Sequence, residues 1–273
     1  MRQRLIWLAM AVAAVVPAFG GPVVNLGTGS SFGLLGGTIS NTGTSVITGN
    51  VGVKNASGTI TGFNPSGTTV GGHVSMPGAT DSTNAYIDFV NAFNTALRLS
   101  STQSYNDLTM SRTFTGNNVY DFTMTNISTT TGINLTFDAQ NNSNEVFVIR
   151  VAGTFTANGI LTFTLANQAQ ASNIYWIIGT DAVLSPASSA PMTFDGDILA
   201  GSSFTMSAAA AGSGTLAGAI NGCVFAETGN TLAGASVPEP GSFGLMSLGC
   251  LLGILAWRKS RLGSGSIVEN PSA

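Results

Sequence analysis

Few side chains in this chain of 273 residues could perform acid–base or nucleophilic chemistry. Its one histidine, His73, follows two glycines, and no second histidine or HExxH pattern accompanies it as a metal site would require. The serines lack the G-x-S-x-G pattern of a nucleophile that is followed by Asp and His. We therefore expect no catalytic residue, no metal ligand and no cofactor, and we classify the protein as a non-enzyme.

A carboxylate pair, Asp195 and Asp197, is separated by Gly196. On a strand, side chains two residues apart point to the same side, which could suit Ca²⁺ binding or glycoside chemistry. Asp and Gly are also typical of turns, where the carboxylate accepts hydrogen bonds from nearby backbone amides. We favour the turn, and a β-helical polysaccharide lyase or hydrolase is the least favoured function.

Threonine offers a different kind of surface. The pattern Thr-x-Thr recurs at 113–115, 154–156 and 162–164. On a strand it places two methyl and hydroxyl groups about 6.7 Å apart on one face. Such short side chains lose little rotamer entropy when they are held rigid, so they could order neighbouring water. The alternative is that threonine is simply a good β-former on a surface with few charges.

Charged residues make up only 8% of the chain, against roughly 25% in an ordinary soluble domain. The net charge is −3, and residues 22–236 hold ten acidic and four basic side chains. A nucleic-acid-binding surface needs clustered Lys and Arg to neutralise phosphates, so this class is excluded. Apolar residues still reach 44%, which excludes a charged disordered chain and permits a substantial core.

Short β-branched and aromatic runs, bounded by Gly, Asn or Ser, dominate the interior of the sequence, for example at 135–138, 145–149 and 173–178. Runs of this length, separated by such turn-forming residues, predict an all-β sandwich, barrel or solenoid. No repeat of fixed length is visible, so a regular hexapeptide or nonapeptide helix is excluded.

One segment, residues 82–99, breaks the β pattern. It lacks Gly and Pro, and its apolar residues recur at three- and four-residue steps, which predicts an amphipathic α-helix with Asp81 or Ser82 as N-cap. A single helix of this kind must pack against the β framework to be stable. Its expected apolar face comprises Tyr86, Phe89, Val90, Phe93 and Leu97.

The N-terminal end of the chain has the features of a targeting segment. Residues 1–21 combine Arg2 and Arg4, a short apolar stretch and a small-x-small site, which predict a secretory signal peptide that is removed. The apolar stretch is shorter than the about 20 residues that a spanning helix needs. We therefore expect residues 22–236 to form the exported domain.

The C-terminal segment 237–261 resembles the PEP-CTERM sorting signal of Gram-negative bacteria. It consists of a Pro-Glu-Pro sequence, an apolar stretch of transmembrane length and a basic cluster: Pro238, Glu239 and Pro240; residues 241–257; and Arg258, Lys259 and Arg261. The resemblance implies cleavage by a dedicated membrane protease and delivery to the cell surface, with transient or permanent anchoring. A plain membrane anchor is the alternative, because a tail, residues 262–273, continues past the basic cluster.

Several blocks of residues 22–236 are similar, in order and spacing, to the microbial ice-binding (antifreeze) protein family. The most specific is Ala-Gln-Ala-Ser-Asn-Ile-Tyr-Trp at 169–176, and the others lie at 26–32, 40–43, 46–53, 196–200 and 221–231. The resemblance implies an irregular right-handed β-helix of triangular section with one long α-helix packed alongside.

The same resemblance implies adsorption to ice through a flat, charge-poor face of Thr, Ser, Ala and Asn, which inhibits ice growth and recrystallisation. A family motif, Thr-(Ala/Gly)-x-(Thr/Asn), fits residues 61–64, 115–118, 131–134 and 228–231. The last match and a partial one near the N-terminus are the predicted ice-binding residues: Thr228, Gly229, Asn230 and Thr231, with Thr48 and Asn50.

The implied partners are ice or ordered water, the sorting protease and extracellular polysaccharide. An alternative function is a structural or adhesive protein of the extracellular polysaccharide matrix, which the sorting signal alone would also explain.

Overall fold

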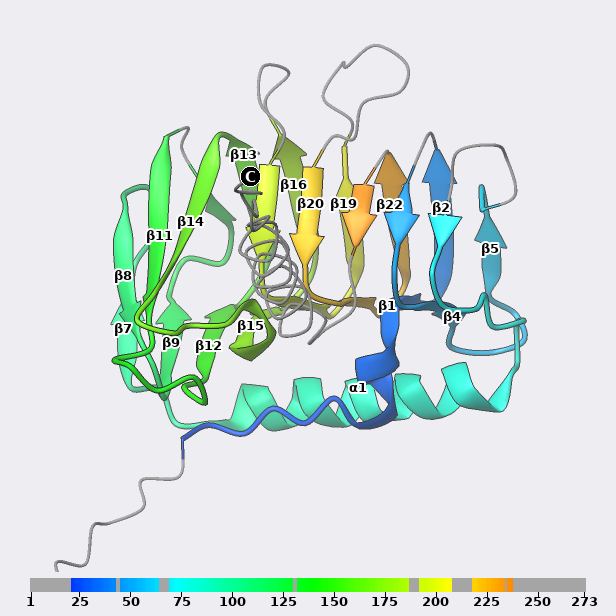
Figure 1. The fold of residues 1–273 in the computed structure, drawn as a ribbon, viewed down its shortest axis with the longest axis horizontal. Coiled ribbons are helices and arrows are strands. Elements are labelled where there is room, and N and C mark those ends of the chain that lie inside the picture. The colour runs from blue at the N-terminus through cyan, green and yellow to red at the C-terminus, as the bar shows by residue number, and fades with distance from the viewer. Residues whose placement is uncertain are drawn as a thin grey trace, which may run out of the picture.

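The computed structural model describes residues 21–42, 45–63, 69–129, 132–186, 192–207, 218–233 and 235–237. These residues form a β-solenoid, whose short strands stack on those of the neighbouring coils, together with one long α-helix, α1 (Thr80–Arg98) (Figure 1). The strands pair in parallel, as a continuously winding chain requires. The prediction of an irregular β-helix with one helix alongside is confirmed.

Two long sheets run the length of the solenoid. Sheet A contains, in spatial order, β4 (Asn50–Val53), β1 (Phe32–Gly36), β21 (Val224–Ala226), β18 (Asp197–Ala200), β15 (Ile174–Ile178), β12 (Phe147–Val151), β9 (Asn118–Phe122) and β7 (Gln103–Tyr105). Sheet B contains β10 (Ile127–Ser128), β13 (Phe155–Gly159), β16 (Ala182–Pro186), β19 (Ser203–Met206), β22 (Gly229–Ala233), β2 (Thr38–Thr42) and β5 (Thr59–Thr61).

The third side is divided into two shorter sheets. Sheet C contains β17 (Met192–Asp195), β20 (Gly218–Asn221), β23 (Ala235–Val237), β3 (Val46–Ile47) and β6 (Thr69–Val70). Sheet D contains β14 (Leu161–Ala166), β11 (Ile133–Asp138) and β8 (Arg112–Thr115). Two short 3₁₀ helices, η1 (Gly27–Ser31) and η2 (Ala171–Asn173), precede strands of sheet A.

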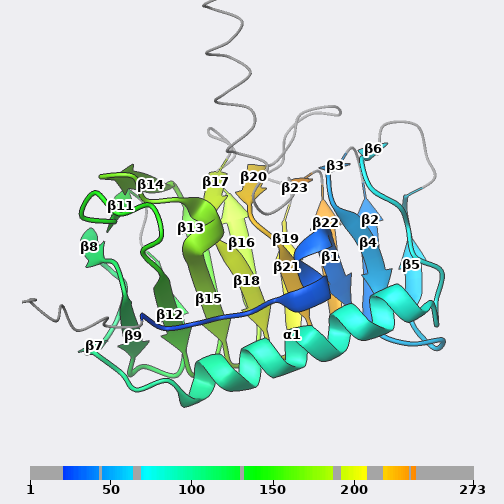
Figure 2. The ribbon, with the colours of Figure 1, turned by 60° about the horizontal axis from the view of Figure 1, so that its bottom comes forward.

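The order of the coils differs from the order of the sequence. The first coil, β1 to β3, lies between the second coil, β4 to β6, and the last coil, β21 to β23. Helix α1 extends along sheet A from the second coil to the opposite end, and the chain then winds back coil by coil (Figure 2). Pairs such as Leu34 with Val224 therefore join the N-terminal and C-terminal parts of the domain's sequence in adjacent strands.

The interior is filled by aromatic and aliphatic side chains from alternate strand positions. Trp176 is fully buried, and its ring lies 5.2 Å from that of Phe155 and 5.1 Å from that of Phe194. Its indole N–H donates to the backbone carbonyl of Asp195 at 3.1 Å, so the one polar group of this side chain is satisfied. Dense packing of this kind makes the solenoid a stiff support for its outer surfaces.

Helix α1 covers sheet A with a face that the periodicity predicted only in part. Its buried residues are Ser82, Ala85, Phe89, Ala92 and Ala96, whereas Leu97 is 46% exposed. Tyr86, Val90 and Phe93 are partly buried at the margins. Three alanines let the helix backbone approach the sheet closely, and the larger side chains flank the contact. The predicted apolar face is therefore corrected: Phe89 is buried as expected, but Leu97 is exposed and the three alanines, which were not predicted, form most of the contact.

The helix begins two residues before its predicted start, with Ala79 as the N-cap and no side-chain capping bond. The expectation that Asp81 or Ser82 caps it is wrong. The Asp81 carboxylate instead accepts hydrogen bonds from the preceding loop, and the Ser82 hydroxyl donates to the carbonyl of Ala79 at 3.2 Å.

The predicted signal peptide, apart from residue 21, and the predicted sorting segment from residue 238 onward lie outside the described residues. Within the described part of the chain, no helix has both the length and the apolar character needed to cross a membrane.

Candidate functional site

The outward surface of sheet B, here called the sheet B face, is built from short side chains. Inward and outward residues alternate along its strands, as in β2, where Ile39 and Asn41 are buried. The outward residues are Ser128; Thr156 and Asn158; Val183 and Ser185; Ser203 and Thr205; Gly229, Thr231 and Ala233; Thr38, Ser40 and Thr42; and Thr59 and Thr61.

A central row crosses all seven strands of this face without a register shift. Its members, in spatial order, are Ser128, Thr156, Val183, Thr205, Thr231, Ser40 and Thr61. Successive members are therefore separated by the spacing between adjacent strands, about 4.8 Å, and the stacking of coils allows a sheet to remain flat. Six of the seven carry a hydroxyl group.

Several of these hydroxyls are anchored to the neighbouring strand. The hydroxyl of Thr42 donates to the carbonyl of Leu232, that of Thr61 donates to Ile39, and that of Thr38 donates to Thr228. The distances of 3.4–3.5 Å mark weak bonds, but each one favours a single rotamer. These three hydroxyls, of which Thr61 belongs to the central row, are thus oriented before any ligand arrives.

No outward residue of the sheet B face is charged. At the margin of the sheet, directly before β16, lies the carboxylate of Asp181. It accepts hydrogen bonds from the backbone N–H and the hydroxyl of Ser203 at 3.1 and 2.6 Å. The hydroxyl bond to Ser203 is the main reason why the pKa of Asp181 lies below its ordinary value.

The other two sides of the solenoid differ from this one. Helix α1 covers sheet A. The third side is divided between sheets C and D, and sheet D carries Arg112 and Asp138. Among the described residues, sheet B is therefore the continuous long sheet that is neither covered by a helix nor charged.

The structure distributes the predicted ice-binding residues over different places. Thr231 lies in the central row, Gly229 lies on the same strand at the margin of the face, and Thr228 lies in the turn before it. Asn230 points inward: it is 1% exposed and its amide donates to the carbonyl of Leu35 at 3.0 Å. This side chain closes the interior of the coil and cannot contact a surface ligand.

Thr48 and Asn50 lie at another corner, between sheets C and A. The amide of Asn50 donates to the hydroxyl of Ser31 at 3.4 Å, and its carbonyl oxygen accepts the backbone N–H of His73 at 3.0 Å. The structure therefore does not bring this pair together with Thr231 on one face.

Most residues of the central row were not predicted from the sequence. Ser128, Thr156, Val183, Thr205 and Thr231 follow one another after 28, 27, 22 and 26 residues. Coils of unequal length leave no period to detect, and the row continues from Thr231 to Ser40 at the other end of the chain. Besides the motif match that contains Thr231, two sequence signals include a residue of the row: the Thr-x-Thr pattern at 154–156 contains Thr156, and the motif match at 61–64 begins with Thr61.

His73 belongs to a cluster that resembles a catalytic triad only in composition. Its Nε2 lies 2.6 Å from an oxygen of Asp81 and 3.0 Å from the hydroxyl of Ser75. In a triad the carboxylate orients the histidine through Nδ1, which leaves Nε2 to activate the serine. Here both partners meet the same nitrogen, and Ser75 is only 2% exposed, so the cluster stabilises the start of α1 rather than performing nucleophilic chemistry.

Asp195 and Asp197 stand on two strands that meet at a corner, with Gly196 between them at a φ of 115°. They therefore do not share one face of a strand as a metal site would need. Asp195 accepts a bond from the amide of Asn221 at 2.6 Å, and Asp197 accepts one from the backbone N–H of Cys223 at 2.8 Å. Both carboxyl groups thus link this corner to the next coil. The chain does bend at Gly196, but the expectation that the carboxylates bond nearby backbone amides is wrong, because both partners lie 26 residues further along the chain.

Burial of Asp197, which is 1% exposed, raises the pKa of its carboxyl to about 7. In the unfolded chain the pKa is about 3.9. Between these values the folded state binds more protons than the unfolded state, so the contribution of Asp197 to stability falls as pH rises.

We expect Asp197→Asn to remove this pH dependence. An asparagine can still accept the amide bond but carries no proton to lose. The stability of the variant relative to the unchanged protein should rise by up to about 1.4 kcal/mol per pH unit between pH 4 and 7. Urea unfolding of both proteins at several pH values measures this difference. The other carboxyl groups are the same in both proteins, so their contributions to the pH dependence cancel. A difference that stays constant with pH would contradict the assignment.

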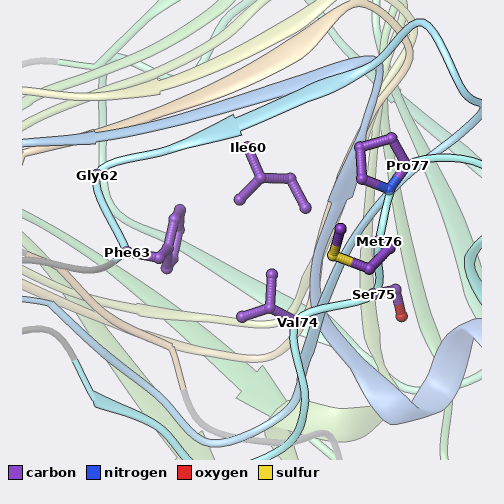
Figure 3. Close-up of a pocket in the computed structure, with 7 residues that line it drawn as sticks. All are labelled: Ile60, Gly62, Phe63, Val74, Ser75, Met76 and Pro77. Atoms are coloured by element: carbon purple, nitrogen blue, oxygen red, sulfur yellow. The ribbon is translucent and has the colours of Figure 1, made fainter.

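An apolar hollow of about 480 Å³ lies at the β5 end of the solenoid (Figure 3). The side chains of Ile60, Phe63 and Val74 point toward one another across it, and Met76 lies at its rim. Among its lining residues only Ser75 carries a polar side chain, and that hydroxyl is already bonded to Asp81. The hollow therefore offers no group for acid–base chemistry.

In the part of the chain that the structure describes, the architecture is that of a β-solenoid with one long, uncharged and uncovered sheet. Residues 34–237 match the ice-binding-like family, and residues 236–261 match the PEP-CTERM protein-sorting motif. The chain belongs to the ice-binding-like family, and its sorting motif implies export and sorting to the cell surface.

Individual relatives agree with this assignment. The chain is 32% identical over 245 residues to an ice-binding protein of Nostoc sp. (strain HG1), covering 86% of each. Among solved structures it resembles the ice-binding protein of the Antarctic ascomycete Antarctomyces psychrotrophicus, with a TM-score of 0.67, 27% identity and coverage of 79% of this chain and 98% of the other. An ice-binding protein from an Antarctic biological consortium gives a TM-score of 0.66 at 25% identity, covering 79% and 90%.

Proposed function

We propose that this protein adsorbs to ice through the sheet B face and so inhibits ice growth and recrystallisation. One observation carries the proposal: seven parallel strands present an unbroken row of short hydroxyl and methyl side chains without a charge. Family membership supports ice binding in general, and the geometry favours this face over the others.

Adsorption to ice depends on the order of the water next to the face. A charged side chain holds its hydration shell in orientations that an ice lattice does not match. Methyl groups between weak hydroxyl anchors impose a milder order, and the rigid stack of coils keeps that order regular along the sheet. Because these short side chains are already held by neighbours, little rotamer entropy is lost on binding. Adsorbed molecules then leave curved ice between them, which grows less readily.

The six residues predicted from the sequence enter this proposal unequally. We include Thr231 and Gly229 in the contact surface and place Thr228 at its margin. We leave out Asn230, because it is buried, and Thr48 and Asn50, because they lie at a different corner. We retain residues 1–21 as a signal peptide and residues 241–257 as a membrane segment in the proposed route to the cell surface.

The test is the behaviour of ice in the presence of the purified protein. We expect shaped ice crystals, a gap between the melting and freezing points (thermal hysteresis) and slower recrystallisation. Binding to extracellular polysaccharide without any effect on ice would instead support the structural or adhesive alternative, for which the sorting motif is the favouring observation. Absence of all three effects on ice would overturn the proposal.

A further inference from the structure

The chain contains two Asn-Gly pairs, Asn158-Gly159 and Asn221-Gly222, in contrasting surroundings. We propose that Asn158-Gly159 is a site of spontaneous deamidation, which inactivates the sheet B face by placing a negative charge on it. The consequence for activity rests on the proposed ice-binding function, whereas the chemistry does not.

The reaction is an internal attack on the asparagine side chain. The amide nitrogen of Gly159 loses its proton and bonds to Cγ of Asn158, and Nδ2 leaves as ammonia, which produces a five-membered succinimide. Water then opens the ring at one of its two carbonyls and yields aspartate or isoaspartate. Glycine at the second position favours the attack, because it has no Cβ to hinder the approach and moves freely through backbone conformations.

The backbone ladder is weak around this pair. Asn158 is exposed, and Gly159 ends β13 with a φ of 69°. On one side, the N–H of Asn158 donates to the hydroxyl of Thr129 at 3.0 Å rather than to a backbone carbonyl. On the other side, the pairing of β13 with β16 ends at Gly159 and Pro186, so Gly159 lies at the end of this ladder. Local opening, which the attack requires, therefore costs little here.

The second pair provides an internal comparison. The amide of Asn221 donates to the carboxyl of Asp195 at 2.6 Å, and Gly222 is buried. Its backbone lies inside the stacked corner, where the attacking geometry cannot form without opening of the coil. We therefore expect Asn221 to remain intact while Asn158 reacts.

Deamidation changes the sheet B face at a defined place. Asn158 is aligned with Ser185 on β16, and its Nδ2 donates to the hydroxyl of Ser128 at 2.9 Å. An aspartate there loses this donor and introduces a full negative charge. An isoaspartate also adds a methylene to the main chain, which disturbs the register of β13.

The experiment ages the purified protein in warm, mildly alkaline buffer and follows it by peptide mass spectrometry, isoaspartate detection and thermal hysteresis. We expect conversion at Asn158 well before Asn221, with hysteresis falling in step. Asn158→Thr cannot form the succinimide, so its hysteresis after ageing should equal its own value before ageing, whatever that value is. Asn158→Asp should show lower hysteresis than the unchanged protein without any ageing.

Equal or slower reaction at Asn158 than at Asn221 would overturn the proposed site. Conversion at Asn158 with unchanged hysteresis would overturn its effect on the face. If fresh protein shows no hysteresis at all, the proposed function fails, but the mass measurement still decides whether the deamidation site is real.

Discussion

Thr231→Tyr is expected to weaken adsorption to ice on the order of tenfold, a loss of about 1.4 kcal/mol, and so to lower thermal hysteresis strongly. Thr231 stands in the central row between Thr205 and Ser40. A tyrosine there projects from a flat surface and holds its neighbours away from ice. Because the side chain points outward from β22, the fold should tolerate the change. Hysteresis at equal protein concentration, with circular dichroism to confirm folding, measures the effect.

Thr95→Tyr is the matched control. It makes the same chemical change at an exposed position of α1, far from sheet B, and should leave hysteresis unaltered. Thr231→Val should retain much of the activity, because it preserves the methyl group and the shape of the row. Full activity in Thr231→Tyr, or an equal loss in Thr95→Tyr, would show that another surface contacts ice.

The second large effect is expected for Arg150→Met, which should lower the free energy of unfolding by about 2–3 kcal/mol. The guanidinium of Arg150 forms a bidentate pair with Asp121, at 2.5 and 2.8 Å. It also donates to the carbonyls of Ala96, Leu97 and Leu99 at 3.0, 3.0 and 2.7 Å. The carbonyls of Ala96 and Leu97 lie in the last turn of α1 and that of Leu99 belongs to its C-cap, where the regular helical hydrogen bonds end; the Ala96 carbonyl also accepts the backbone N–H of Leu99 at 3.4 Å. The substitution removes both contacts and leaves the Asp121 carboxylate without its cation.

Urea unfolding measures this loss, and Arg98→Met provides the comparison. Arg98 is exposed in the last turn of the same helix, so its substitution should change stability by no more than about 0.5 kcal/mol. Hysteresis per folded molecule should be unaltered in both variants, because neither residue lies on sheet B. Equal stability of the two variants would contradict the role assigned to Arg150.

Some elements followed directly from local patterns. The alternation in residues 135–138 and 173–178 appears as β11 and β15, and the three- and four-residue spacing around Phe89 appears as α1. The cap of the helix was mispredicted because the Asp81 carboxylate is held by Ser75, a partner that local sequence cannot reveal. Asn230 shows the same limit, since its polar side chain turns inward to bond the first coil.

The sequence by itself determined the class of the molecule, namely a charge-poor, exported β-helix of the ice-binding-like family with one helix and a sorting motif. Alternation, composition and short motifs are local properties, so they can be read without coordinates. Only the tertiary structure decided which residues share a face. Register across the sheet B face depends on coils of unequal length, which no local pattern reveals. It also depends on the position of the first coil beside the last, which is set by hydrogen bonds between residues some 190 positions apart.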